Sequence, residues 1–171
     1  MKKNFPFYKQ PGSKDCGPTC LRIIAKYYGK LISLQKIREV SETTREGSNL
    51  LKLSDAAEAI GFKTIGVKLE FNKLKEAPLP LIVHWNKNHF AVVYKIKNNE
   101  VFVSDPAYGL IKYNFSEFIK HWIGNNADAS TKEGIALLLE TTPNFKKQEW
   151  EETNKTSLKF LSQYFFKHKS L

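Results

Sequence analysis

The sequence lacks several features that would place it in a class at once. Its 171 residues include only two cysteines, too few for a disulfide framework, and Cys16 and Cys20 lie so close together on one predicted helix that a bridge would need unfavourable geometry. We therefore expect free thiols in a reducing compartment. The longest apolar runs are too short to cross a bilayer, and the first thirty residues hold no export signal. The chain as given is predicted to be neither exported nor membrane-spanning.

The chain does have abundant hydrophobic material and an excess of positive charge. Apolar residues make up 42% and aromatic residues 13% of the sequence, which excludes a disordered chain. Residues 1–140 carry 21 basic and 14 acidic side chains, and residues 141–171 carry 6 and 3. Such a diffuse charge could attract RNA, an anionic membrane or an acidic peptide, or serve only solubility. Nucleic-acid binding has the least support, because no compact basic stripe with interleaved aromatic residues is found.

The order of the predicted elements indicates an α+β domain. Capping residues and apolar periodicity predict three helices in the first half, which begin at Asp15, at Ser33 and at Ser48 or Asn49. The second half turns to short β-type runs over 62–69, 81–85, 90–96, 101–104, 110–113 and 135–139, with one helix at about 116–122. Three helices followed by an antiparallel sheet make an α+β fold.

A change in composition after Glu140 predicts two parts, a compact domain over 1–140 and a tail over 141–171. The tail begins as a polar linker and continues, over 155–169, as a basic amphipathic helix. Such a helix could lie on a membrane surface, dock on a partner or pack back onto its own domain.

Cys16 stands at the start of the first predicted helix. The unpaired backbone N–H groups and the positive end of the helix dipole favour thiolate over thiol there. Gly17 is expected to leave room beside the sulfur for a substrate backbone. Asp15 is expected to cap the helix, and because its carboxylate would oppose thiolate formation we leave it out of the catalytic set. Cys20, one turn later, is expected to be a core residue.

A thiolate nucleophile needs a base, and the base needs a group that holds its ring. His89 precedes one predicted strand and Asp105 ends the next, so a hairpin around residues 98–99 would place these two side chains together. The predicted triad is Cys16, His89 and Asp105. Gln10 carries an amide that could donate to a developing oxyanion together with the backbone N–H of Cys16.

Two other interpretations of these residues compete with the triad. A zinc site would use Cys16, Cys20, His84 and His89, although the cysteine spacing is not that of common zinc knuckles. His84 is also a rival base, but His89 is preferred because the predicted hairpin places Asp105 beside it. Trp85 could border a cleft or fill the core.

These motifs together resemble the N-terminal peptidase domain of peptidase-containing ABC transporters. Those papain-like enzymes remove double-glycine leader peptides from bacteriocins and related secreted peptides. The matching segments are residues 10–21, residues 88–90, and Asp105-Pro106 followed by Gly109. They occur in the family's order and spacing over about residues 1–140.

The resemblance implies a papain-like cysteine endopeptidase that cuts after a Gly-Gly pair through a thioester acyl-enzyme. Cys16 would be the nucleophile, His89 the general base and later acid, Asp105 the group that orients His89, and Gln10 the oxyanion donor. It implies no metal and no cofactor for the peptidase domain. ATP would serve only a nucleotide-binding domain, and this chain has no Gly-rich loop ending in Gly-Lys-Ser or Gly-Lys-Thr.

The resemblance also implies partners and a location. The partners would be a precursor peptide with a double-glycine leader and the transmembrane and nucleotide-binding domains of a parent transporter, with no nucleic acid. The peptidase would work on the cytoplasmic side of the bacterial inner membrane, which the basic tail could contact. We expect the chain to be part of such a transporter, with a free-standing peptidase as one alternative. Another is a catalytically silent papain-like domain that binds a leader or cargo peptide for export.

Overall fold

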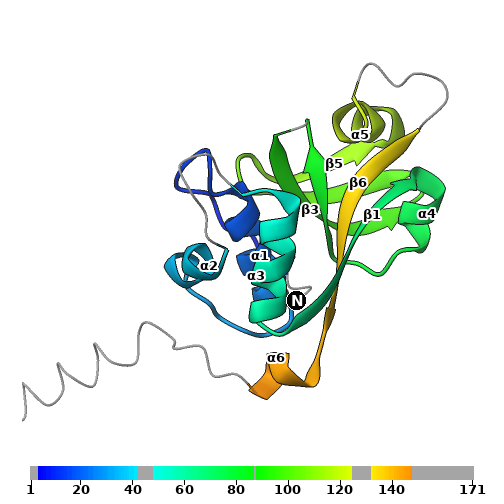
Figure 1. Ribbon diagram of the computed structural model, residues 1–171. Coiled ribbons are helices and arrows are strands. Elements are labelled where there is room, and N and C mark those ends of the chain that lie inside the picture. The colour runs from blue at the N-terminus through cyan, green and yellow to red at the C-terminus, as the bar shows by residue number, and fades with distance from the viewer. Residues whose placement is uncertain (1–3, 42–47, 87, 125–131, 148–171) are drawn as a thin grey trace, which may run out of the picture.

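The computed structural model describes residues 4–41, 48–86, 88–124 and 132–147. Figure 1 shows their arrangement, in which helices pack against one twisted sheet. The helices are α1 (Cys16–Tyr27), α2 (Leu34–Val40), α3 (Leu50–Ala59), α4 (Phe71–Glu76), α5 (Phe115–Trp122) and α6 (Pro143–Lys147). The strands are β1 (Phe62–Glu70), β2 (Leu81–Trp85), β3 (His89–Lys97), β4 (Glu100–Asp105), β5 (Gly109–Asn114) and β6 (Glu133–Thr141). The α+β class and all the predicted strands are confirmed.

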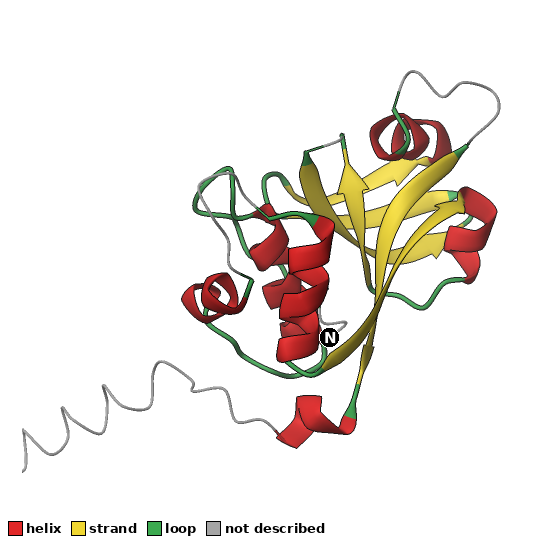
Figure 2. Cartoon of the chain, viewed as in Figure 1, coloured by secondary structure: helices red, strands yellow, loops and turns green. Residues whose placement is uncertain are grey.

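The six strands form a single antiparallel sheet in the order β1-β6-β2-β3-β4-β5. Helices α1, α2 and α3 cover one face and α4 and α5 the other (Figure 2). Because successive side chains of a strand point to opposite faces, Ile82 and Val92 pack against α1–α3, whereas Val83 and Val93 pack against α4 and α5. Both faces of the central strands are therefore buried.

Turns and caps follow the sequence signals with one exception. Asn98 and Asn99 have φ of 52° and 61°, the left-handed conformation that a tight hairpin turn requires. The side chains of Ser33 and Asn49 accept hydrogen bonds from backbone N–H groups in the first turns of α2 and α3. Asp15 precedes α1, but its side chain makes no capping hydrogen bond. Asp15 therefore holds the expected N-cap position, but the expected side-chain cap is not made, because Arg38 and Gly12 occupy its carboxylate.

The packed part of the chain continues past the expected boundary at residue 140. Strand β6 runs to Thr141, whose neighbour Thr142 donates its hydroxyl to the carbonyl oxygen of Gly61 at 2.6 Å. Phe145 of α6 is buried, with its ring centroid 4.6 Å from that of Phe62. The amphipathic helix predicted over 155–169 lies outside the described residues. Among the residues that are described, no helix is both long and apolar enough to cross a membrane.

Candidate active site

Cys16 is the first residue of α1 and is only 6% exposed. The helix lies against β3, with Leu21 and Ile24 fully buried in the core between them. Gly17, next to the thiol, faces inward: an added Cβ would lie 3.2 Å from Leu53 Cδ1 and 3.5 Å from a ring carbon of Phe90. The expectation that Gly17 makes room for substrate is therefore wrong. The glycine lets α1 pack closely on α3 and β3.

His89 and Asp105 meet as the hairpin predicts. His89 Nε2 lies 2.8 Å from Asp105 Oδ1. The Asp105 side chain is fully buried, and the same Oδ1 accepts the backbone N–H of Ala107 at 2.8 Å. The carboxylate is thus fixed by the chain that follows β4, and it fixes the ring of His89 in turn.

The thiol of Cys16 completes this row of groups. Cys16 is near enough to His89 for its side chain to raise the pKa of the imidazole, and because Nε2 is occupied by Asp105, Nδ1 is the ring nitrogen left for the sulfur. Burial alone would lower the pKa of His89, but the hydrogen bonds and charges of Asp105 and Cys16 outweigh it and raise that pKa to about 9. Imidazolium is therefore the form of His89 at neutral pH, which suits a thiolate partner.

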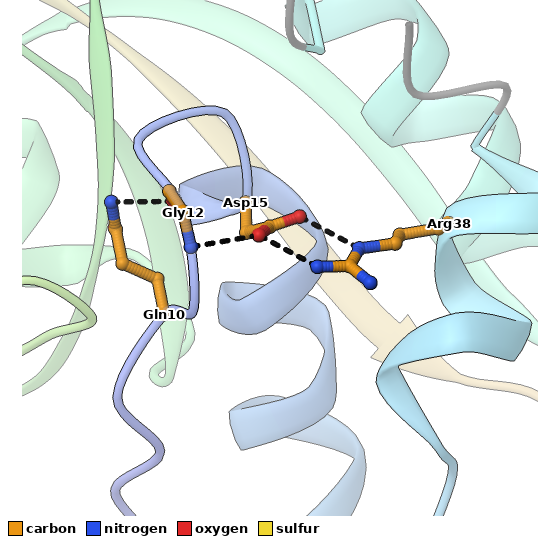
Figure 3. Close-up of polar contacts among 4 residues, drawn as sticks. All are labelled: Gln10, Gly12, Asp15 and Arg38. Carbon is orange, nitrogen blue, oxygen red and sulfur yellow. Dashed lines mark hydrogen bonds and ion pairs between the residues drawn. The ribbon is translucent and has the colours of Figure 1, made fainter. Parts of the chain in front are cut away.

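Gln10 lies in the segment that precedes α1 and is tied to the sheet by its backbone. Its N–H donates to the carbonyl of Pro106 at 2.9 Å, directly after Asp105. Pro6, which lies before Gln10 in the same segment, is also tied to the sheet, because its carbonyl accepts a hydrogen bond from the hydroxyl of Ser104. The side-chain Nε2 of Gln10 donates to the carbonyl of Gly12 at 3.0 Å (Figure 3). An amide nitrogen carries two hydrogens, so one remains for a substrate oxygen.

The other candidate residues lie elsewhere. Cys20 is fully buried in the core, and burial, with the charges of Cys16 and Asp105, raises the pKa of its thiol well above the usual value. The ring of His84 packs on Phe90, with centroids 5.1 Å apart. Trp85, which the sequence left open, is buried in the core between the sheet and α5. Within the described ranges, no three His, Cys, Asp or Glu residues are grouped to hold a metal ion.

One residue near the site was missed by the sequence reasoning. Arg38 of α2 forms two hydrogen bonds of 2.7 Å with the carboxylate of Asp15. The sequence indicates only that the carboxylate of Asp15, beside a nucleophilic thiol, needs a positively charged partner. It does not indicate which of the 27 basic residues is that partner.

Comparison with known proteins gives consistent matches. The model of the peptidase C39 family matches residues 4–133. A lactococcin-G-processing and transport ATP-binding protein of Lactococcus lactis is 39% identical over 121 residues, and a pediocin PA-1 transport/processing ATP-binding protein of Pediococcus acidilactici is 34% identical over 121 residues. These matches cover 67% and 66% of this chain but only 17% of either relative.

Solved structures match over more of the chain. A double glycine motif protease from an AMS/PCAT transporter, crystallised with the leader peptide, is 33% identical with a TM-score of 0.70, and the match covers 81% of this chain and 93% of that one. The peptidase domain of Streptococcus ComA, a bi-functional ABC transporter involved in quorum sensing, is 26% identical with a TM-score of 0.70, covering 81% and 100%. The shared architecture is the papain-like α+β fold.

Proposed function

The chain belongs to the peptidase C39 family, and from that premise we propose that it is a cysteine endopeptidase that removes leader peptides by cutting after a Gly-Gly pair. The observation that carries the proposal is the pairing of His89 with Asp105 and the interaction of His89 with Cys16, while Gln10 lies on the segment that leads to Cys16 and is bonded to Pro106, the residue after Asp105. A domain that only binds peptides has no chemical need of all four groups. The names of the relatives and of the leader-bound structure support this substrate class.

The proposed reaction begins with a thiolate of Cys16 and an imidazolium of His89. The sulfur attacks the carbonyl carbon of the second glycine. The oxyanion that forms accepts hydrogen bonds from the backbone N–H of Cys16 and from the second amide hydrogen of Gln10. When the C–N bond breaks, His89 gives its proton to the departing amine and a thioester remains. Neutral His89 then takes a proton from water and hydroxide attacks the thioester. The C–S bond breaks, so the leader leaves as a carboxylic acid and the thiolate of Cys16 and the imidazolium of His89 are restored. Asp105 holds the ring throughout, and the chemistry uses no cofactor.

A Gly-Gly substrate fits the limited access to the thiol. Cys16 is buried to all but 6% and His89 exposes 17% of its side chain, so residues without side chains can approach where larger ones cannot. We further propose that this domain acts beside the transmembrane and nucleotide-binding domains of a transporter, on the cytoplasmic side of the membrane. These partners rest on the family, since the curated relatives extend far beyond the matched segment.

The direct test is mass spectrometry of a precursor peptide with a double-glycine leader after incubation with the protein. The wild type is expected to release two fragments split after the second glycine, and Cys16→Ala to release none, because no other described thiol is placed beside His89. Cys20→Ala is the matched control and should still cut. Full cleavage by Cys16→Ala would overturn the mechanism, whereas tight peptide binding by an inert wild type would favour a silent binding domain.

A further inference from the structure

The turn before the nucleophile is joined to helix α2 by a chain of short polar contacts (Figure 3). Arg38 Nε and Nη2 each donate to one oxygen of the Asp15 carboxylate at 2.7 Å. Oδ2 of that carboxylate also accepts the N–H of Gly12 at 3.0 Å. The Gly12 carbonyl accepts both the Asp15 N–H, at 3.1 Å, and Gln10 Nε2, at 3.0 Å. Arg38 is thus connected by hydrogen bonds through Asp15 and Gly12 to the side-chain amide of Gln10, the proposed oxyanion donor.

Without Arg38, the negative charge of Asp15 would disfavour the thiolate of Cys16. Its side chain is 10% exposed and it directly precedes Cys16. A negative charge poorly screened by water at this distance opposes the formation of a thiolate. The hydrogen bond with Arg38 lowers the pKa of Asp15; burial acts in the opposite direction, and the charge of Arg38 and the Gly12 N–H add to the lowering. Asp15 therefore stays ionised, as half of a closed ion pair.

Helix α2 is anchored so that it presents Arg38 to Asp15. Ile37, the preceding residue, is fully buried in the core shared with α1 and α3. Ser33 caps the start of the helix, and the Ser41 hydroxyl donates to the Arg38 carbonyl at its end. The planar fork of a guanidinium matches a carboxylate with two parallel hydrogen bonds, which a lysine cannot do. The contact fixes the direction of the Asp15 side chain as well as its charge.

We propose that Arg38 is a positioning residue of the peptidase site: it neutralises Asp15 beside Cys16 and, through Asp15 and Gly12, holds the Gln10 amide where the oxyanion forms. The cleavage part of this inference rests on the proposed function. Its electrostatic part concerns the reactivity of the Cys16 thiol and can be measured without a peptide substrate.

The test replaces Arg38 with a neutral side chain of similar reach. In Arg38→Gln the charge of Asp15 is left unpaired, so the pH at which iodoacetamide alkylates Cys16 at half its maximal rate should rise by about one unit. With the leader peptide, kcat should fall about tenfold while KM changes less than twofold, because the lost contacts act on the oxyanion and not on peptide binding. Arg38→Lys should fall between wild type and Arg38→Gln.

A second variant separates this role from a loss of folding. In the double variant Asp15→Asn/Arg38→Gln no charge is left uncompensated, and an Asn oxygen can still accept the Gly12 N–H. Its alkylation profile should return to within about 0.3 units of wild type. Lys73→Gln breaks an exposed ion pair of α4 with Glu76 and should match wild type in both assays. The Cys16→Ala variant is a further control, because any alkylation that remains in it occurs at Cys20.

The outcomes separate the two hypotheses. An Arg38→Gln protein with the alkylation profile of wild type would overturn the role of Arg38, as would a double variant that keeps the full defect of the single one. If the wild type cuts no double-glycine peptide, the proposed function fails. In that case a shifted alkylation profile that recovers in the double variant still supports the electrostatic part of the inference.

Discussion

The two sides of the candidate active site are built in different ways. On the sheet side, His89 and Asp105 stand at adjoining ends of β3 and β4, and Asp105 is fully buried. On the helix side, the turn before Cys16 depends on the pair between Asp15 and Arg38, in which the arginine is 41% exposed. One side is fixed by a backbone ladder and the other by a half-exposed charge contact.

This difference teaches where the site tolerates change. If the buried carboxylate of Asp105 is removed, nothing takes over its hydrogen bond to the ring of His89, because water cannot replace a lost contact in the interior. A half-exposed ion pair is partly screened, and losing it costs less. We therefore expect changes on the sheet side to be severe and changes on the helix side to be graded, and three experiments test that order.

The largest effect is expected from Asp105→Ala. His89 would lose the group that holds its ring, and kcat/KM should fall by about a hundredfold or more. Asp105 also raises the pKa of His89, so its removal should move the alkaline limb of the kcat/KM profile from about pH 9 to lower pH. The limb moves this way because imidazolium, the required form, is then lost at lower pH.

The measurement is a pH profile of leader cleavage for wild type and Asp105→Ala, with thermal unfolding followed in parallel. The matched control is Ser104→Ala, which removes the neighbouring hydroxyl bonded to Pro6 and should leave the alkaline limb in place. An unmoved limb in Asp105→Ala would show that the carboxylate does not govern His89.

The sheet side was also the side that the sequence could predict. The hairpin follows from two apolar runs around Asn98-Asn99, and the positions of His89 and Asp105 follow from the hairpin alone. The turn residues and the antiparallel pairing of two strands are sufficient to predict that His89 and Asp105 meet. The buried fate of Cys20 follows in the same way from its position on an amphipathic helix.

The helix side could not be predicted as far. Arg38 lies 23 residues from Asp15 in sequence, and their contact depends on how α2 packs on α1, which periodicity does not determine. For the same reason Asp15 was assigned the local role of a cap, and Gly17 a role toward substrate. The Asp15 carboxylate instead pairs with Arg38 of α2, and Gly17 packs against Leu53 of α3 and Phe90 of β3.

A middle effect is expected from Gly12→Ala, which disturbs the helix side without changing any charge. An added Cβ would lie 3.2 Å from Asp15 Oδ2, so the carboxylate must shift by a few tenths of an ångström and its bond to the Gly12 N–H weakens. We expect kcat to fall about three- to fivefold with little change in thermal stability. In the control Gly66→Ala on β1, the Cβ meets only a Leu50 methyl at 3.4 Å, and activity should be unchanged. A Gly12→Ala enzyme as impaired as Asp105→Ala would contradict the expected order.

The smallest effect is a difference in how the two sides stabilise the fold as pH changes. Arg38 lowers the pKa of Asp15 from 3.8, so that pair stabilises the fold above pH 3.8 and its contribution is lost as the pH falls through the lower folded value. The pKa of His89 rises from 6.5 to about 9 against the effect of its burial, so its contribution is complete below pH 6.5 and is lost as the pH rises through about 9. Acid weakens the helix side, and alkali weakens the sheet side.

Urea unfolding between pH 3 and pH 10 measures both contributions in one protein. Because Arg38 and His89 retain solvent contact, each change in the free energy of unfolding should be on the order of 1 kcal/mol. Asp15→Asn should flatten only the acid limb and Asp105→Ala only the alkaline limb, since each removes one pair and leaves the other. If either variant flattened both limbs, the two pairs would be coupled through the fold, and the two sides of the site would have to be treated as one structural unit.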